Sequence, residues 1–243
     1  MGLLYARRLA EAGCELLLVS NQEAELQRVA EEIQVANGVG VIAQYQDLAT
    51  ETAADELYAF CQERGVQVDI LINNAGMFFF EELGLENEAK AMAMMRLHML
   101  TPTRLCLLFG EEMKQRGTGY ILNVSSMAAK LPCPGISLYS ATKAYLKSFS
   151  KSLYFEMRPY GVGVTVVCPG AIATPLYKLK PSLLKVGVKI GLIGTPEWLV
   201  RRALRGMFRR RRVVKPGFMN YYLPPLIAIL PNGVVYRLWR KFK

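Results

Sequence analysis

The sequence has few of the residues that build disulfide scaffolds or metal centres. Its 243 residues include five cysteines and one histidine, and no two cysteines stand at the spacing of a metal-ligating pair. Cysteines that are odd in number and scattered along a chain are typical of reduced thiols. The sequence therefore predicts a cytoplasmic protein without a metal site.

Long apolar runs are also absent. Arg7, Arg8 and Glu11 interrupt the N-terminal segment, and Ala6 stands where a myristoylation signal has Ser or Thr. The apolar stretch at residues 221–236 contains three prolines and falls short of the ~20 residues that span a bilayer. We expect neither a signal peptide nor a membrane-spanning helix.

Acidic residues are missing from residues 201–243, which hold twelve lysines and arginines. The rest of the chain has 18 basic and 20 acidic residues, so the positive excess resides in this basic, apolar C-terminal tail. Aromatic residues beside the cations suit an anionic membrane surface, although a solvated helix followed by a tail packed on the body or on a second subunit is the simpler interpretation. Because no recognition-module signature accompanies the cations, we expect no nucleic-acid partner.

The composition is that of a globular protein. With 52% hydrophobic and 21% charged residues, the chain is neither disordered nor fibrous, and it is long enough to bury a sizeable core. We expect a single domain over residues 1–243.

Apolar segments alternate with amphipathic ones. The first group predicts strands at residues 14–19, 39–44, 69–73, from 120, and 162–168. The second predicts helices at residues 3–12, 21–36, 50–64, 87–116 and 139–159. This alternation, without an internal repeat, predicts an α/β fold with a doubly wound, Rossmann-like parallel sheet between two layers of helices.

Polar and turn-forming residues follow several predicted strands. They are Asp47, residues 73–76, the pair Ser125 and Ser126, and the pair Pro169 and Gly170. Because ligands of such sheets bind at the carboxyl ends of the strands, we expect these residues to meet at one site.

Tyr139 and Lys143 stand four residues apart at the start of a predicted helix, and therefore on one helix face. A cation about 4 Å from a phenol can bring its pKa of ~10 near neutrality, which makes the phenol a general acid/base. The alternative is an ordinary surface pair, which is the common meaning of this spacing when it occurs by itself.

Taken together, these motifs resemble the short-chain dehydrogenases/reductases over nearly the whole chain. The resemblance rests on Asn73-Asn74-Ala75-Gly76, on Ser126 thirteen residues before Tyr139, on Tyr139 with Lys143, and on Pro169-Gly170 with Thr174. Within the family the chain looks most like the hydroxysteroid dehydrogenase and the 3-ketosphinganine or 3-ketoacyl reductase branches.

The resemblance implies a role for each matching residue. Tyr139 would be the proton donor, Ser126 would steady the substrate carbonyl, and Lys143 would assist the tyrosine and bind the nicotinamide ribose. Ser125 is interpreted as a strand-end spacer. The implied cofactor-binding residues are Gly2, Asn21, Asp47, Asn74, Ala75, Gly76, Tyr139, Lys143, Pro169, Gly170 and Thr174.

The N-terminus departs from the family pattern. The family carries T-G-x-x-x-G-x-G between its first strand and first helix, and here only Gly2 fits, as the last glycine. The first strand would lie between the strands at 14–19 and 69–73. We therefore expect that this strand is missing from the sequence and that the natural start lies some twenty residues earlier.

Two further departures concern His98 and the cofactor. His98 stands where the family usually has Asn near the lysine, so we treat it as a candidate catalytic residue that could hold water or relay protons. The second strand ends at Ser20-Asn21 without the acid that NAD users commonly carry, which favours NADP(H) over NAD(H).

Residues 175–195 stand where the family has its substrate lid, so we interpret this apolar, basic and glycine-containing segment as the lid. We expect an oxidoreductase that transfers hydride between NADP(H) and a ketone or secondary alcohol of an apolar steroid or long-chain keto lipid. The alternative is a non-catalytic interaction protein with a defective cofactor site. Since the long helices commonly pair in this family, a homo-oligomer is expected.

Overall fold

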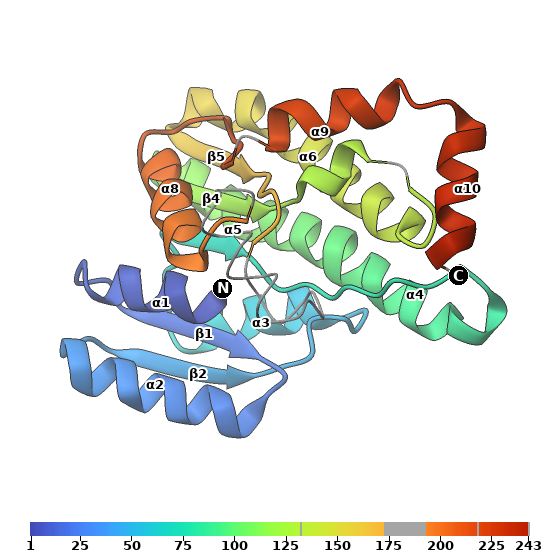
Figure 1. Cartoon of the computed structure of the whole chain (residues 1–243). Coiled ribbons are helices and arrows are strands. Elements are labelled where there is room, and N and C mark those ends of the chain that lie inside the picture. Colours follow the sequence, from blue (N-terminus) through green and yellow to red (C-terminus); the bar gives the residue numbers. More distant parts are fainter. Residues whose placement is uncertain (132, 173–192, 218, 243) are drawn as a thin grey trace.

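The computed structural model describes residues 1–131, 133–172, 193–217 and 219–242 (Figure 1). Thr174 and most of the expected lid at 175–195 lie outside the described residues. The strands are β1 (Leu16–Ser20), β2 (Val41–Tyr45), β3 (Ile70–Asn73), β4 (Gly119–Val124), β5 (Val162–Val167) and β6 (Val213–Val214). The α-helices are α1 (Gly2–Ala10), α2 (Glu23–Asn37), α3 (Ala53–Glu63), α4 (Glu88–Met95), α5 (Thr101–Arg116), α6 (Ser137–Met157), α8 (Pro196–Phe208), α9 (Met219–Ala228) and α10 (Asn232–Phe242). The shorter helical turns are η1 (Leu85–Asn87), η2 (Arg96–Leu100), η3 (Met127–Lys130) and η4 (Arg158–Tyr160).

All strand pairs of the described residues are parallel. β1 pairs with β2, and β3, β4, β5 and β6 follow one another in a second sheet. Every residue of β5 is buried, as its run of valines predicts for a strand that is covered on both faces. The predicted doubly wound Rossmann-like fold is confirmed.

Helices cover the larger sheet on both faces (Figure 1). On one face, α3, α5 and α6 pack around a core that includes Phe109, Met113 and Met157. On the other face, α1 and α8 bury Leu9 and Met207 against β4 and β5. The result is the expected three-layer arrangement.

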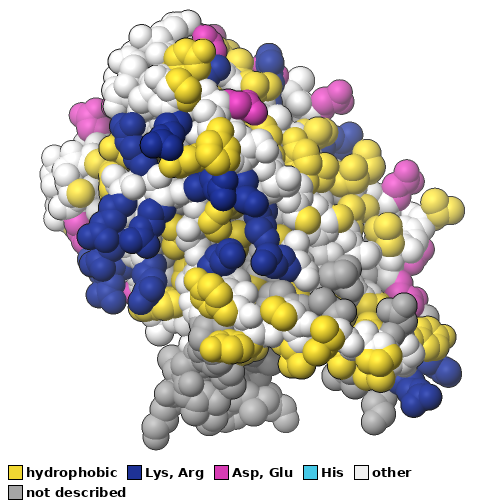
Figure 2. All heavy atoms as spheres, turned by 90° about the horizontal axis from the view of Figure 1, so that it is seen from above, with side chains coloured by type: hydrophobic (Ala, Val, Ile, Leu, Met, Phe, Trp, Pro, Cys, Tyr) yellow, Lys and Arg dark blue, Asp and Glu magenta, His cyan; other side chains and the backbone are white. Residues whose placement is uncertain are grey.

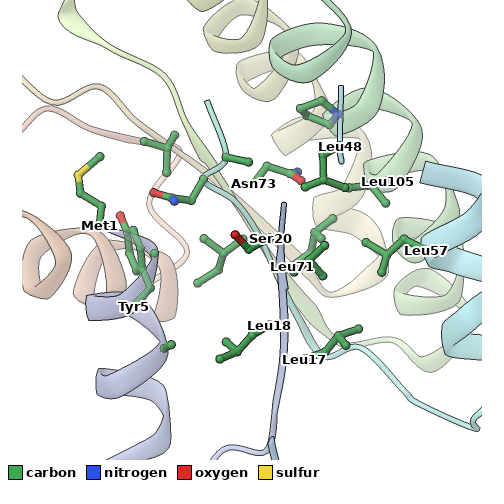
Figure 3. Close-up of a pocket in the computed structure, with 18 of the residues that line it drawn as sticks. Met1, Tyr5, Leu17, Leu18, Ser20, Leu48, Leu57, Leu71, Asn73 and Leu105 are labelled. Carbon is green, nitrogen blue, oxygen red and sulfur yellow. The ribbon is translucent and has the colours of Figure 1, made fainter. Parts of the chain in front are cut away.

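The sheet is interrupted between β1 and β3. These two strands are not paired with each other, and among the described residues the edge of each that faces the gap has no strand partner. A cleft of about 1760 Å³ lies there, and Figure 3 shows Leu17, Leu18 and Leu71 around it, with Met1 and Tyr5 at one side. The interruption falls between the two strands where the sequence predicted that a strand was missing.

Several elements differ from the sequence prediction in their limits. The helix predicted over 87–116 contains one turn of π-helix, η2, between α4 and α5. The basic segment that starts at residue 201 begins within α8, which ends at Phe208. The arginines after α8 lead into β6, a strand that the sequence pattern did not reveal. The proline-containing tail forms the helices α9 and α10. None of the helices in the described part of the chain is both long and apolar enough to cross a bilayer.

Candidate active site

Tyr139 and Lys143 lie one turn apart near the start of α6, on the helix face that packs toward β4. Both residues are buried, with 9% of Tyr139 and 5% of Lys143 exposed. The Lys143 Nζ lies 5.8 Å from the centroid of the Tyr139 ring and donates a hydrogen bond to the carbonyl of Val124 over 3.1 Å. The helical spacing has therefore produced a buried cation beside a phenol, not a surface pair.

The burial of Lys143 changes its acidity. Removal of the ammonium from water disfavours its charged form and lowers the pKa of Lys143 to about 8. At neutral pH the side chain remains a cation. A cation in such a poorly solvated setting can stabilise a neighbouring phenolate more strongly than a surface lysine could.

The two serines at the end of β4 have different partners. The Ser125 hydroxyl donates to the backbone carbonyl of Lys143 over 2.7 Å and so ties β4 to α6, which suits the expected spacer role. The Ser126 Oγ accepts the backbone N–H of Ala128 over 3.1 Å and caps η3. Because this bond uses a lone pair of Ser126, its own O–H can still donate to a substrate oxygen.

His98 lies in the π-helical turn η2 and is almost fully buried. Its Nε2 accepts the backbone N–H of Met77 over 3.0 Å. Its Nδ1 lies 3.0 Å from the Thr142 hydroxyl, which itself donates to the carbonyl of Tyr139 over 2.9 Å. These partners place the imidazole proton on Nδ1, so that His98 donates to Thr142.

The environment keeps His98 neutral. Burial, and secondarily the positive charge of Lys143, lower the pKa of His98 to about 2. The ring lies against Tyr139, with 5.8 Å between the ring centroids. His98 thus joins the loop after β3 to the helix that carries Tyr139 and Lys143, and the sequence pattern did not reveal Thr142 as the link.

The walls around Tyr139 are apolar. Its ring meets that of Phe78 edge to face, with 5.0 Å between centroids, and Met94 and Ala128 belong to the same apolar cluster. Gly76 borders the same space, because a Cβ there would lie 3.0 Å from the Nε2 of His98 and 3.6 Å from the Nζ of Lys143. A glycine at this position leaves room beside the lysine.

Asn73 and Asn74 are neighbours with different surroundings. Asn73 donates to the Asn123 side chain over 2.7 Å and holds β3 to β4. Asn74 borders the cleft between β1 and β3, and its buried Oδ1 has no hydrogen-bond partner in the described structure. A Cβ on Gly2 would lie 3.3 Å from the side-chain nitrogen Nδ2 of Asn74, so these two residues are close.

The other expected cofactor residues surround the same cleft. Asn21 follows β1 and Asp47 follows β2, and both are exposed at its rim. Asp47 accepts the backbone N–H of Ala49 over 2.9 Å. The remaining expected residues that the structure describes and that line the cleft are Gly2, Asn74, Ala75, Gly76, Tyr139, Lys143, Pro169 and Gly170, together with Ser126 and His98.

Two lining residues were missed by sequence reasoning. The hydroxyl of Tyr5 and the Oε1 of Gln46 are buried and have no hydrogen-bond partner within the described residues. Gln46 directly follows β2, so the strand-end rule could have found it, whereas no sequence signal marked Tyr5. Unpaired buried polar atoms are costly, and a polar dinucleotide in this cleft could satisfy them, so the residues present fit such a cofactor.

Comparisons with known proteins agree with this geometry. The family model of the short chain dehydrogenases matches residues 1–182. Mouse 17-beta-hydroxysteroid dehydrogenase type 3 is 34% identical over 180 residues, which cover 73% of this chain and 58% of the mouse enzyme. The match therefore spans less than two thirds of the length of the mouse enzyme. Human very-long-chain 3-oxoacyl-CoA reductase is 32% identical over 246 residues, covering 98% of this chain and 74% of the relative.

A solved structure is similar over almost the whole chain. A short-chain dehydrogenase from Sphingobium yanoikuyae in complex with NADPH superposes with a TM-score of 0.76 at 28% identity and covers 98% of this chain and 90% of its own. The order of strands, the Tyr139 and Lys143 pair, and the family model that spans residues 1–182 lead to one conclusion. The chain belongs to the short-chain dehydrogenase/reductase family.

Proposed function

We propose that this chain is an NADP(H)-linked oxidoreductase that interconverts a ketone and a secondary alcohol on an apolar substrate. The observation that carries the proposal is the placement of Lys143 beside Tyr139 in a buried site, with the Ser126 hydroxyl at the end of the adjacent strand. A surface-binding protein has no need to bury a lysine next to a phenol, because the burial costs free energy.

The residues divide the reaction between them. The Ser126 O–H holds the substrate carbonyl oxygen, and Tyr139 donates its phenolic proton to that oxygen as the alcohol forms. Lys143 stabilises the phenolate that remains on Tyr139. A nicotinamide cofactor held by Lys143 and Asn74 would supply the hydride for this reduction.

Two observations support the choice of substrate. Phe78 and Met94 give the space beside Tyr139 apolar walls. The names of the similar mouse and human enzymes both refer to large apolar molecules, a steroid and a very-long-chain acyl thioester. We therefore propose a steroid ketone or a long-chain 3-oxoacyl compound as the substrate class.

The choice of NADP(H) depends on the end of β1. Ser20 and Asn21 carry no charge there, so no carboxylate repels a 2′-phosphate. The similar Sphingobium enzyme was solved with NADPH, which agrees with this choice. Lys143 and Asn74 would bind the cofactor within the cleft, and Asp47 would lie at its adenine end.

A homo-oligomer is part of the proposal. Large apolar side chains around α5 are exposed in one chain, including Leu100 on η2 and Leu107 on α5. Helices of this kind bury such residues when two copies pair. Light scattering of the purified chain tests this, and a monomer at micromolar concentration would contradict it.

We propose that the protein is located in the cytoplasm. The free cysteines of the described structure suit the reducing conditions there.

The competing function is that of an interaction protein which keeps the fold but does not bind the cofactor. The specific observation in its favour is the open cleft between β1 and β3. Titration of NADPH, followed by its fluorescence, separates the two functions when it is combined with turnover of a 17-ketosteroid and a long-chain 3-oxoacyl thioester. Binding together with turnover supports the oxidoreductase, whereas the absence of both supports the interaction protein.

A further inference from the structure

One face of the molecule combines clustered cations with exposed aromatic and aliphatic side chains (Figure 2). We call it the basic–aromatic face; it comprises Lys130, Lys147, Lys151 and Lys215 and the exposed side chains of residues 221–229. Its cations are close neighbours, since Lys130, Lys151 and Lys215 all act electrostatically on Lys147. The Lys215 Nζ lies 5.9 Å from the centroid of the Tyr221 ring, which brings the cationic part and the aromatic part together.

The cations of this face lack acidic partners. None of Lys130, Lys147, Lys151 and Lys215 forms a salt bridge with a carboxylate among the residues that the structure describes. Elsewhere, arginines such as Arg8, Arg28 and Arg104 each pair with an acid. Uncompensated clustered cations repel one another, so the face is suited to an anionic partner.

The apolar part of the face belongs to α9 and the turn after it. Tyr221 is 60% exposed, Tyr222 70% and Ile229 77%, and Leu226 is exposed between them. α9 is nevertheless held on the body, because it packs against η3. At its start, Asn220 donates to the carbonyl of Pro216 over 2.7 Å. The exposed side chains therefore project from an anchored helix, which presents them to a partner.

α10, which follows α9 in the chain, adjoins the loops around the active site. The Trp239 ring of α10 meets that of Phe80 with 5.5 Å between centroids, and a Cβ on Gly135 would touch Trp239. Phe78, two residues before Phe80, contacts Tyr139. An apolar compound in a layer beside α9 and α10 would thus lie next to the walls of the candidate site.

Three kinds of partner could cover the face. A second copy, docked through this face about a two-fold axis, would bring two cationic clusters together, and like charges oppose that contact. A nucleic acid would meet the lysines but leave Leu226 and Ile229 without apolar partners. A bilayer with anionic lipids offers phosphates to the lysines, an interfacial layer to the tyrosines and acyl chains to the aliphatic residues.

We propose that the basic–aromatic face docks on the surface of an anionic lipid bilayer. In this arrangement Lys147, Lys151 and Lys215 contact lipid headgroups, while Tyr221, Tyr222 and Ile229 enter the interfacial region. In this arrangement the described part of the chain rests on the bilayer surface. This docking does not depend on the proposed oxidoreductase activity.

Co-sedimentation of the full chain with vesicles tests the proposal. Vesicles of phosphatidylcholine are compared with vesicles in which about a third of the lipid is phosphatidylglycerol, and we expect binding to the anionic vesicles alone. The triple variant Lys147→Gln, Lys151→Gln and Lys215→Gln is expected to bind roughly 100-fold more weakly, because each cation near an anionic surface contributes about fivefold.

A matched control removes three charges elsewhere. Arg8→Gln, Arg28→Gln and Arg104→Gln change the net charge equally on α1, α2 and α5, and we expect vesicle binding to stay within about twofold of the unmodified chain. Equal losses in the two triple variants would overturn the proposal, because binding would then depend on net charge alone. Circular dichroism establishes that each variant is folded.

A second variant tests the apolar contribution. Tyr221→Ser, Tyr222→Ser and Ile229→Ser keep the charge, and we expect vesicle binding to fall at least tenfold. Unchanged binding by this variant refutes docking through α9. The proposal also fails if a single-stranded oligonucleotide binds to the same lysines more tightly than the vesicles do. It fails as well if the lysine substitutions dissociate a dimer and no form of the chain binds lipid.

Discussion

The Lys143 ammonium lies 5.8 Å from the centroid of the Tyr139 ring, and both residues are buried on the same face of α6. Ser125 fixes this geometry from β4 by donating to the backbone carbonyl of Lys143. His98 and Thr142 fix it from the side of η2. This pair is therefore held by hydrogen bonds from Ser125 after β4 and from His98 in η2, two segments outside α6.

Replacement of Tyr139 by Phe removes the proton donor and keeps the ring. We expect turnover of the ketone substrate to fall by roughly 10²–10⁴-fold, the usual contribution of a positioned general acid. The oxidation of NADPH, followed by absorbance, measures the loss. Tyr145→Phe is the matched control on the same helix, since the Tyr145 hydroxyl bonds to Thr103 and not to the site. Full turnover by Tyr139→Phe would refute the proposed chemistry.

Lys143→Met tests the burial of the ammonium. The pKa of Lys143 is lowered to about 8 in the folded chain, so between pH 8 and 10.5 the unfolded chain binds more protons at this residue. The stability of the native sequence should therefore rise relative to Lys143→Met over that range, by about 1.4 kcal/mol per pH unit. Urea unfolding at several pH values measures this. Parallel curves for the two chains would mean that Lys143 is solvated.

His98→Asn tests whether the imidazole titrates. Because the pKa of His98 is lowered to about 2, the unfolded chain binds the extra proton below pH 6.5, and the native sequence loses stability there. We expect that loss, about 1.4 kcal/mol per pH unit, to be absent from His98→Asn.

The same variant separates positioning from proton relay. With both ring nitrogens occupied by Met77 and Thr142, we expect His98→Asn to leave the pH dependence of turnover unchanged between pH 6 and 9, about where a relay residue would titrate. A shifted pH profile would instead support the relay role expected from the sequence.

The open edges of β1 and β3 predict a response to an added strand. An apolar strand and glycine-rich loop placed ahead of Met1 should pair with both edges, raise the melting temperature and tighten NADPH binding, since each buried backbone hydrogen bond adds about 1 kcal/mol. A glycine–serine extension of the same length is the control. If neither extension changes melting or binding, the cleft is not a strand site.

Asn21→Asp tests the choice of cofactor. A carboxylate at the end of β1 should repel the 2′-phosphate, so we expect the ratio of NADPH to NADH affinity to fall by roughly tenfold or more. Asn37→Asp adds the same charge at the end of α2, where the residue does not line the cleft. This control should leave the ratio of NADPH to NADH affinity unchanged. Equal effects of the two substitutions would place the 2′ position elsewhere.

The local patterns of the sequence determined much of this protein. The spacing of Tyr139 and Lys143 placed both on one helix face, because the helical period is a local property. Runs of apolar residues located β1 to β5, and the strand-end rule brought Asp47, Asn74 and Ser126 to one cleft. The prediction of a parallel doubly wound sheet followed from the same alternation and is confirmed.

Other features depend on contacts between distant segments, and only the tertiary structure decided them. The two bonds of His98 to Met77 and Thr142 join segments more than twenty residues apart, so no local pattern could reveal them. The strand β6 has two residues and exists only because β5 offers it an edge. The tail around Pro224 and Pro225 forms α9 because it packs on η3, a tertiary contact that outweighs the weak helical propensity of proline.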